Sequence, residues 1–447
     1  MGIDGGFIDQ WRELCPQAFF DREEPLSLPS GFLAKDFHAF IDGQLKVMRG
    51  GRAGSWEHFL DKMFVDPINR LFRLGAVVVI LAFDDYSLVP TAKAPTQRER
   101  AMQAARSGVP EPWDPQIVQV QLGADFPENY MKLIFDRKFK TKVCQFVVSN
   151  VASRVDLENG RRLVIDWQEG SQLEFIAGAH GLENGKSTRR PGFQCVGECD
   201  CKWVQHLEAG RDMAVDSIDS DYIPIAMLQL ERLRREHDND SQAVPRIAIH
   251  RLHSKNYEWV DCNRLLDGIT NHITNHITDH VPDALAGREF KLVAYLVALT
   301  KCDFVKGLPG IGPKTVWENL PALCRSLAGA WREPGPSESG EFDVGSVADM
   351  VVLPLLRSRV SALSALPDRL SLSESLEQAH AATGTQALTD NQSKNLELPK
   401  LVCNIRNANW TVLYWTDCPA APDPVDARYG FCRLPDGTVD WDSNAAL

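Results

Sequence analysis

The chain of 447 residues is long enough for two or three domains, and its composition, 44% hydrophobic and 24% charged, is that of a globular protein. Its longest continuous apolar stretch, residues 75–83, is too short to span a bilayer, so we expect no membrane partner. The net charge of −12 excludes a large basic surface. It does not exclude a polyanionic partner, because the local charge of a surface governs binding more than the total does.

The eleven cysteines are an odd number and have no repeating spacing. This pattern favours reduced thiols over a disulfide framework. The start of the chain carries neither the basic flank nor the apolar core of a secretory signal. We therefore expect an intracellular protein, with the nucleus favoured, and we favour a monomer.

Residues 1–106 have the pattern of the N-terminal part of an α/β core. A helix-rich stretch leads into the run GAVVVILAF, which suits a central, mainly parallel sheet. Over residues 107–191 the pattern changes to short β-branched segments, KVCQFVVSNV, RRLVIDW and SQLEFIA, separated by turn signals. These segments predict a β-rich, antiparallel insertion of two to four strands.

Helical periodicity returns over residues 192–331, which we take as the internal part of the core. The segment REPGPSESGEF that follows has the composition of a linker. We assign residues 332–395 to a linker and helical region and residues 396–447 to an accessory C-terminal segment. The predicted fold class is therefore α/β, with a β-rich insertion and a C-terminal extension.

Acidic residues follow several of the predicted strands and turns. Because functional groups collect at the carboxyl ends of parallel strands, such residues would converge on one crevice. Hard divalent cations with oxygen ligands, Mg²⁺ or Mn²⁺, would keep the cluster ionised. Any single member could equally be a helix cap or a solvated turn. The residues are Asp42 in FIDG, Asp84 in LAFDD, Glu198 and Asp200 in GECDC, Asp219 and Asp221 in DSIDSD, and Asp303 in KCDF.

Four blocks stand in a fixed order along the chain: MGIDGG, then FDD with PTQRERA, then GECDC with DSIDSD, and last CDFVKGLPGIGPKTV. Together they resemble the flap endonuclease/XPG family of structure-specific 5′ nucleases, over roughly residues 1–100 and 195–330. The resemblance implies a PIN-like nuclease core. It also implies that the last block is a helix-two-turn-helix element that binds DNA.

The resemblance further implies that the seven acidic residues bind two Mg²⁺ ions, with Mn²⁺ as an alternative, for two-metal hydrolysis that leaves a 5′-phosphate. Lys93, Arg98 and Arg100 resemble the family's basic catalytic residues, which steer the phosphate. Gly2 belongs to the family's Met-Gly-Ile start and is a candidate for nucleic-acid contact. The hairpin would grip duplex DNA around a K⁺ ion through Gly310, Ile311, Gly312 and Lys314.

A further candidate for nucleic-acid contact is DRKFKTK, in which Arg137, Lys138 and Lys140 alternate with an aromatic residue. The same pattern is typical of an exposed strand edge that lysines protect. Both interpretations stay open from the sequence.

Three departures from the family pattern bear on the substrate. The segment between the second and third blocks, a helical arch that threads single strands in the family, reads partly as β here. Many members have an aromatic residue six positions after the first metal aspartate, and Met48 stands there in this chain. We also find no sliding-clamp peptide. We expect a DNA substrate with a 5′ flap, branch or end, as in repair and replication. RNA cleaved in the manner of 5′–3′ exoribonucleases, or a catalytically inactive nucleic-acid-binding scaffold, are the alternatives.

Overall fold

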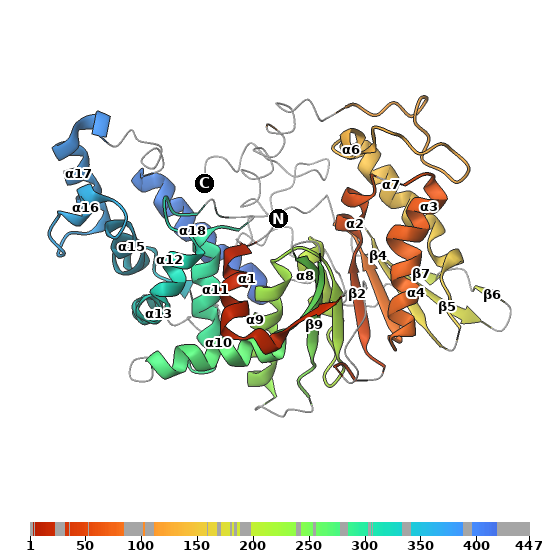
Figure 1. Ribbon diagram of the computed structural model, residues 1–447, viewed down its shortest axis with the longest axis horizontal. Helices are drawn as coiled ribbons and strands as arrows, with labels where there is room; N and C mark the ends of the chain where they lie inside the picture. The colour runs from red at the N-terminus through yellow and green to blue at the C-terminus, as the bar shows by residue number, and fades with distance from the viewer. Residues whose placement is uncertain are drawn as a thin grey trace. The chain divides into compact units, whose positions relative to one another are not determined.

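The structure is a computed structural model, and its ribbon is drawn in Figure 1. The chain divides into two compact units, each described by itself below. Unit 1 comprises Met1–Phe19, Asp219–Asn239 and Asn263–Asp417, and the described part of unit 2 lies within Phe20–Ile218 and Asp240–Cys262. The residues that the structure describes are 3, 5–22, 32–34, 36–51, 53–84, 102, 111–158, 160–167, 171–178, 181–182, 186–187, 198–237, 243–253, 256–277, 285–302, 305, 307–332, 341–387 and 396–417.

Five parallel strands form the centre of the sheet in unit 2. Their order in space is β9-β8-β2-β3-β4, and every neighbouring pair is parallel. The order reverses at β2, the first of the five along the chain, so the carboxyl ends of β2 and β8 flank a topological switch point. The α/β class with a mainly parallel central sheet is confirmed. The strands are β2 (His38–Asp42), β3 (Val78–Ala82), β4 (Arg162–Trp167), β8 (Met213–Asp216) and β9 (Ile247–His253).

Antiparallel strands extend this sheet on both sides. On one side β10 (Asn256–Asp261) pairs with β9, and β1 (Phe19–Arg22) follows it. On the other side β5 (Ser171–Gly178) pairs with β4 and also with β6 (Gly181–Leu182) and β7 (Lys186–Ser187). The segment RRLVIDW is therefore β4 of the parallel centre, and the antiparallel strands begin after it.

The prediction of a strand for KVCQFVVSNV is wrong, because these residues lie in the helix α7 (Arg137–Asn150). Asp136 caps the helix by accepting a hydrogen bond from the Phe139 amide at 3.0 Å. The buried side chains of Phe139, Val143, Phe146 and Val147 recur at helical spacing. Burial of this stripe in the core of unit 2 outweighs the preference of its β-branched residues for a strand.

Helices pack on one face of the parallel strands and form the main core of unit 2 (Figure 1). Alternate residues of the strands, such as Ile41 and Leu81, point into this core. Trp56 is fully buried at its centre, with its ring 5.8 Å from that of Phe59 and 5.3 Å from that of Phe146. The helices of unit 2 are α2 (Gly43–Arg49), α3 (Trp56–Leu60), a π-helical turn (Asp61–Val65), α4 (Asp66–Arg73), α6 (Tyr130–Leu133), α7, a 3₁₀ turn (Ala152–Arg154), α8 (Cys199–Lys202) and a second 3₁₀ turn (Trp203–His206).

Unit 1 is mainly helical. Its helix α18 is tied to α9 and α11 by hydrogen bonds: the Gln229 side chain donates to the Trp415 carbonyl at 2.9 Å, and the Tyr295 hydroxyl donates to the Ile405 carbonyl at 3.2 Å. None of the described helices is long and apolar enough to cross a membrane. The elements are α1 (Gly5–Leu14), a 3₁₀ turn (Pro16–Ala18), α9 (Tyr222–Glu236), α10 (Cys262–Ile277), α11 (Glu289–Thr300), α12 (Pro313–Glu318), α13 (Leu320–Gly329), β11 (Trp331–Arg332), β12 (Glu341–Phe342), α14 (Val344–Val347), a π-helical turn (Ala348–Val352), α15 (Leu353–Arg357), α16 (Ser361–Ser364), α17 (Leu372–Ala387) and α18 (Leu398–Asp417).

A buried glutamate on α9 makes the stability of unit 1 depend on pH. Glu231 accepts a hydrogen bond from the Phe290 amide at 2.7 Å, and burial raises the pKa of its carboxyl from 4.5 to about 8. Between pH 4.5 and about 8, Glu231 is therefore protonated in the folded protein and ionised in the unfolded chain. The stabilisation is complete below pH 4.5 and is lost as the pH rises towards about 8.

We expect the Glu231→Gln variant to remove most of this pH dependence, because the amide stays neutral and its oxygen can still accept from Phe290. Urea unfolding of both proteins across this pH window measures the effect. The wild type should lose up to roughly 5 kcal/mol more than the variant on going from the acidic to the alkaline end. Parallel losses in the two proteins would contradict the assignment.

Candidate active site

Acidic residues line the carboxyl edge of the parallel strands in unit 2. Asp42 ends β2 and lies beside Ala82 of β3, which in turn lies beside Asp166 of β4. On the other side of β2, Asp216 ends β8 and lies beside His250 of β9. The strand register therefore places three aspartates and a histidine along one edge of the sheet, next to the switch point.

Asp84 joins this edge to a segment far along the chain. Its Oδ1 accepts a hydrogen bond of 2.9 Å from the amide of Cys199, a residue 115 positions later. That amide belongs to the peptide bond that follows Glu198, and Asp200 comes next. The thiol of Cys199 also donates to the carbonyl of Ala82 at 3.4 Å. Two of the sequence blocks thus meet at the end of β3. Asp84 binds the amide of Cys199, and Glu198 and Asp200 are the residues on either side of Cys199.

Asp42 also caps a helix. Its Oδ1 accepts from the Leu45 amide at 2.9 Å, which caps α2, and its Oδ2 accepts from the Ser217 hydroxyl at 3.1 Å. Asp42 and Glu198 are both buried, with 6% and 5% of their surfaces exposed. These two bonds fix the orientation of the Asp42 carboxylate at the edge of the sheet.

Asp216, which matches no ligand of the family pattern, carries its own cations. Lys46 lies 2.7 Å from its Oδ2, and the Nδ1 of His250 lies 2.8 Å from its Oδ1. Burial by itself would raise the pKa of Asp216, but Lys46 and His250 outweigh that effect and hold the pKa below its ordinary value. Asp216 is therefore ionised and compensated within the protein.

A buried ion pair holds the far end of α8. The Nζ of Lys202 lies 3.0 Å from Oδ1 of Asp166, and both side chains are completely buried. His206 lies near the other oxygen, at 3.7 Å. Burial acts to raise the pKa of Asp166, and Lys202 together with His206 lowers it below its ordinary value. The short helix that carries Asp200 is thus fixed at its start by Asp84 and at its end by Asp166.

Asp219 and Asp221 belong to unit 1, since the chain passes from unit 2 into unit 1 after Ile218. The Asp221 amide donates to Oδ1 of Asp219 at 3.3 Å, and Asp221 is buried at the start of α9. The hydroxyl of Ser220 donates to the Ile3 carbonyl at 3.0 Å. Within unit 1 this bond joins the DSIDSD block to the first block of the chain.

The glycine-rich loop lies between α11 and α12 of unit 1. Gly307 and Gly310 have positive φ angles of 86° and 71°. A Cβ at Gly307 would lie 1.9 Å from the Thr300 carbonyl oxygen, whereas the space at Gly310 and Gly312 is open. The loop therefore needs Gly307 for its own packing. It leaves the backbone at Gly310 and Gly312 accessible to a ligand.

The other residues predicted for the hairpin differ in exposure. Ile311 is buried, so it can offer a ligand its backbone only. Lys314 is exposed and lies 3.8 Å from Glu318 on the same helix.

The remaining predicted residues fall in two groups. Gly2, Lys93, Arg98, Arg100 and Asp303 lie outside the described residues. On α7, Arg137 and Lys138 are exposed, Lys140 is half-buried, and the intervening Phe139 is completely buried. The aromatic residue of DRKFKTK therefore packs in the core and cannot contact a nucleic acid.

Sequence reasoning missed Asp166 and the two lysines that compensate the edge. Asp166 follows the apolar run Leu163–Ile165 one residue before the end of β4, so a search for acidic residues after apolar strand runs would have found it. Lys46 and Lys202 gave no such signal, because each is recognised only through the carboxylate that it meets. In the part of the chain that the structure describes, no group of three His, Cys, Asp or Glu side chains is arranged to hold a metal ion.

The sequence matches no protein-family model and no curated protein. The resemblance to the flap endonuclease/XPG family therefore rests on the four sequence blocks. Asp42 and the residues that these blocks contribute near the sheet edge, Asp84, Glu198 and Asp200, carry carboxylate oxygens, the donors that Mg²⁺ prefers.

The buried pair of Lys202 and Asp166 can be tested through stability. Lys202→Met leaves a buried carboxylate without its cation, and we expect the free energy of unfolding to fall by about 3–5 kcal/mol. The double variant Lys202→Met/Asp166→Leu removes both charges and should recover most of that loss. Urea denaturation of the three proteins gives the values. A single variant that costs less than about 1 kcal/mol would argue against a structural pair.

The role of Gly307 can be tested against a neighbouring glycine. Gly307→Ala combines a strained backbone with a clash at the Thr300 carbonyl, and we expect a loss of at least about 2 kcal/mol in unfolding free energy. Gly312 has a φ of −116° and open space around it, so Gly312→Ala should stay within about 0.5 kcal/mol of wild type. Thermal or urea unfolding compares them, and equal effects would show that the loop adapts to a side chain.

Proposed function

We propose that this protein is a divalent-metal-dependent phosphodiesterase that cleaves branched or 5′-ended DNA, a hydrolase of the 5′ nuclease type. The observation that carries the proposal is the bond between Asp84 and the Cys199 amide. It joins the Asp84 side chain to the backbone between Glu198 and Asp200 at one edge of a parallel sheet, which supports a shared role for the two sequence blocks. That edge lies beside the topological switch point, where open α/β sheets bind their ligands.

The proposed metal ligands in unit 2 are Asp42, Asp84, Glu198 and Asp200. The resemblance adds Asp219, Asp221 and Asp303 to this set. Two bound Mg²⁺ ions would supply an activated water and would stabilise the leaving 3′ oxygen, so that hydrolysis leaves a 5′-phosphate. All seven proposed ligands offer oxygen donors, which fits Mg²⁺ or Mn²⁺ better than a softer metal.

The protein residues around these ligands have positioning roles. Ser217 and the Leu45 amide fix the orientation of the Asp42 carboxylate. The Cys199 amide orients Asp84. Lys46 and Lys202 compensate Asp216 and Asp166, so these two carboxylates need no metal ion to remain charged. The proposed site thus separates carboxylates with a cation of their own from those assigned to the metals.

The contact with duplex DNA is proposed for the loop between α11 and α12. Open space at Gly310 and Gly312 supports close approach of a phosphate backbone, and the exposed Lys314 adds a positive charge nearby. Such contacts position a substrate without reading its sequence, as a structure-selective nuclease requires. A K⁺ ion bound by the loop carbonyls would belong to the same contact.

One observation favours a second candidate, a nucleic-acid-binding scaffold without activity. Both oxygens of Asp42 already accept hydrogen bonds that cap and fix local structure. In a scaffold Asp42 would need no further ligand. RNA in place of DNA is the other alternative, and it keeps the same metal chemistry.

The enzyme proposal is tested with Asp84→Asn. The amide oxygen can still accept from the Cys199 amide, so the fold should persist while the charge is lost. We expect single-turnover cleavage of a 5′-flapped DNA in Mg²⁺ to fall at least 100-fold, about 2.7 kcal/mol. The matched control is Asp114→Asn, an exposed aspartate that caps a turn by accepting from the Gln116 amide at 2.8 Å. It should cut like wild type.

The substrates for this experiment are single-stranded, blunt and 5′-flapped forms of DNA and of RNA, each in Mg²⁺, in Mn²⁺ and in EDTA. The preferred substrate decides between DNA and RNA. Wild-type protein that binds these substrates but cuts none of them in either metal would overturn the enzyme and favour the scaffold. Equal cutting by wild type and Asp84→Asn would overturn the site.

A further inference from the structure

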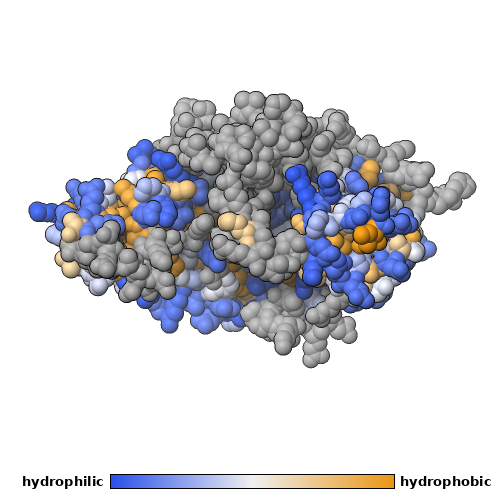
Figure 2. Space-filling view, turned by 90° about the horizontal axis from the view of Figure 1, so that it is seen from above, coloured by the Kyte–Doolittle hydropathy of each residue, from blue (hydrophilic) through white to orange (hydrophobic). Residues whose placement is uncertain are grey.

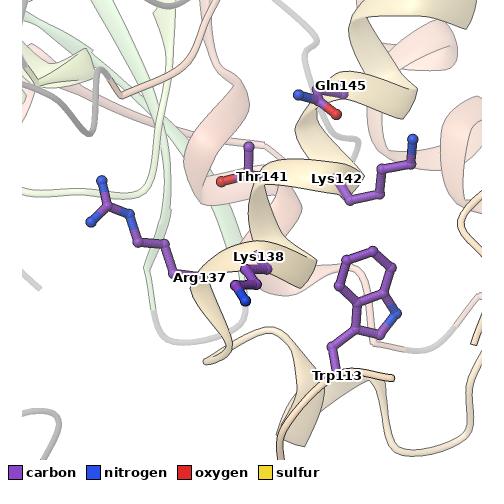
Figure 3. A pocket seen from close by; sticks show the side chains of 6 residues that line it. All are labelled: Trp113, Arg137, Lys138, Thr141, Lys142 and Gln145. Atoms are coloured by element: carbon purple, nitrogen blue, oxygen red, sulfur yellow. The ribbon is translucent and has the colours of Figure 1, made fainter. Parts of the chain in front are cut away.

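A shallow pocket of about 330 Å³ lies beside the first turns of α7, and Figure 3 shows its lining side chains. This volume is at the lower end of the range for small-ligand sites, about 300–1,000 Å³. The indole of Trp113 lies next to the turn of α7 that carries Lys138 and Lys142. The lining residues are Trp113, Arg137, Lys138, Thr141, Lys142 and Gln145.

Lys138 and Lys142 form a positively charged patch on α7. Lys138 and Lys142 stand four residues apart on α7, so they share one face of the helix and repel each other there. Both are exposed, and neither forms an ion pair with any residue that the structure describes. Their positive charges are therefore available to an anionic ligand.

Trp113 is held rigidly beside this positively charged patch. Its Nε1 donates to the Val118 carbonyl at 2.8 Å, and its backbone amide donates to Asp136 at 3.3 Å. The ring packs edge-on against the buried Phe139, with centroids 5.8 Å apart. The indole is half-buried and its other surface lines the pocket. A fixed, partly exposed aromatic ring beside two ammonium groups is the arrangement of a stacking platform.

We propose that this pocket binds single-stranded nucleic acid: a base stacks on Trp113, and Lys138 and Lys142 bind the adjacent phosphates. The inference rests on the proposed function in that it names how the same protein holds a single strand. Thr141 and Gln145, one helical turn apart, offer neutral hydrogen-bonding groups at the same pocket. An acidic peptide would satisfy the ammonium groups but would leave the indole without a planar partner.

The surface around the pocket has a matching character. On the right-hand side of Figure 2, where α6 and α7 lie in Figure 1, a compact hydrophobic patch stands among hydrophilic residues. Exposed apolar side chains of this stretch of chain include Ile117, Met131 and Phe135. Stacking and phosphate contacts read no base edges, so binding at this pocket is tolerant of sequence and sensitive to salt.

Binding is measured by fluorescence anisotropy of a labelled oligothymidylate with the full chain in EDTA, where no metal-dependent cleavage occurs. Trp113→Leu keeps an apolar side chain against Phe139 but removes the stacking ring, and we expect binding to weaken about 5- to 100-fold. Lys138→Ala/Lys142→Ala should weaken binding and reduce the slope of log affinity against log salt by roughly 1.4, about 0.7 for each phosphate. Both lysines are exposed, so this variant tests the pocket even if Trp113→Leu does not fold.

The matched control is Lys62→Ala/Arg73→Ala, which removes two exposed cations of the same unit outside the pocket. Its affinity and salt slope should stay close to those of wild type. Equal losses in the control and in the lysine variant would overturn the proposal in favour of a diffuse charge effect. Displacement of the oligonucleotide by polyglutamate of matched charge as readily as by unlabelled oligonucleotide would overturn the stacking contact.

The two proposals fail separately. If wild type cuts DNA but the pocket variants bind as well as wild type, the pocket is wrong and the nuclease stands. If binding depends on the pocket but nothing is cut in Mg²⁺ or Mn²⁺, the pocket stands and the nuclease is wrong.

Discussion

The arrangement of the candidate site depends on one hydrogen bond, from the amide of Cys199 to Asp84. It closes a segment of more than one hundred residues onto the end of β3. The entropic cost of such a closure grows only slowly with length, but it still has to be met by contacts at the junction. The Cys199 thiol on Ala82 and the buried Lys202–Asp166 pair supply two more. This buried pair holds the end of α8, the helix that carries Asp200.

The same edge of the sheet shows how unit 2 keeps several carboxylates together. Asp216 lies at the end of β8 and Asp166 near the end of β4, and each has a lysine and a histidine close by. In both cases the cations overcome the effect of burial and keep the pKa of the aspartate low. The protein therefore neutralises within its own fold the two edge carboxylates that lie outside the family's ligand pattern. The partners of Asp216 come from the neighbouring strand β9 and from α2 after β2, whereas those of Asp166 come from α8 and the turn that follows it.

Local sequence patterns predicted the elements whose structure depends mainly on residues close in the sequence. The all-apolar run before Asp84 fixed β3, because a strand covered on both faces needs no alternation. The segment KVCQFVVSNV misled for the opposite reason. Its β-branched residues suit a strand, but its buried positions follow a helical period that matters only once the core around Trp56 exists. Lys46 and Lys202 could not have been found from the sequence, because their partners are set by strand order and register. The position of Trp113 beside the basic segment depends on tertiary contacts, its bonds to Val118 and Asp136 and its packing on the buried Phe139, which no local pattern shows.

The position of α7 also changes how a single strand would be held under the proposed function. Residues 111–178 contribute α6, α7, β4 and β5 to the body of unit 2, in the helical layer and the sheet. α7 packs through Phe139, Val143 and Val147 into the main core, so it cannot move as part of an open arch without exposing that core. A strand held by Trp113, Lys138 and Lys142 would therefore lie along the outer surface of a rigid helix. A strand held on a surface does not need to pass a free end through the protein. Substrates with blocked 5′ ends would then be bound as readily as substrates with free 5′ ends.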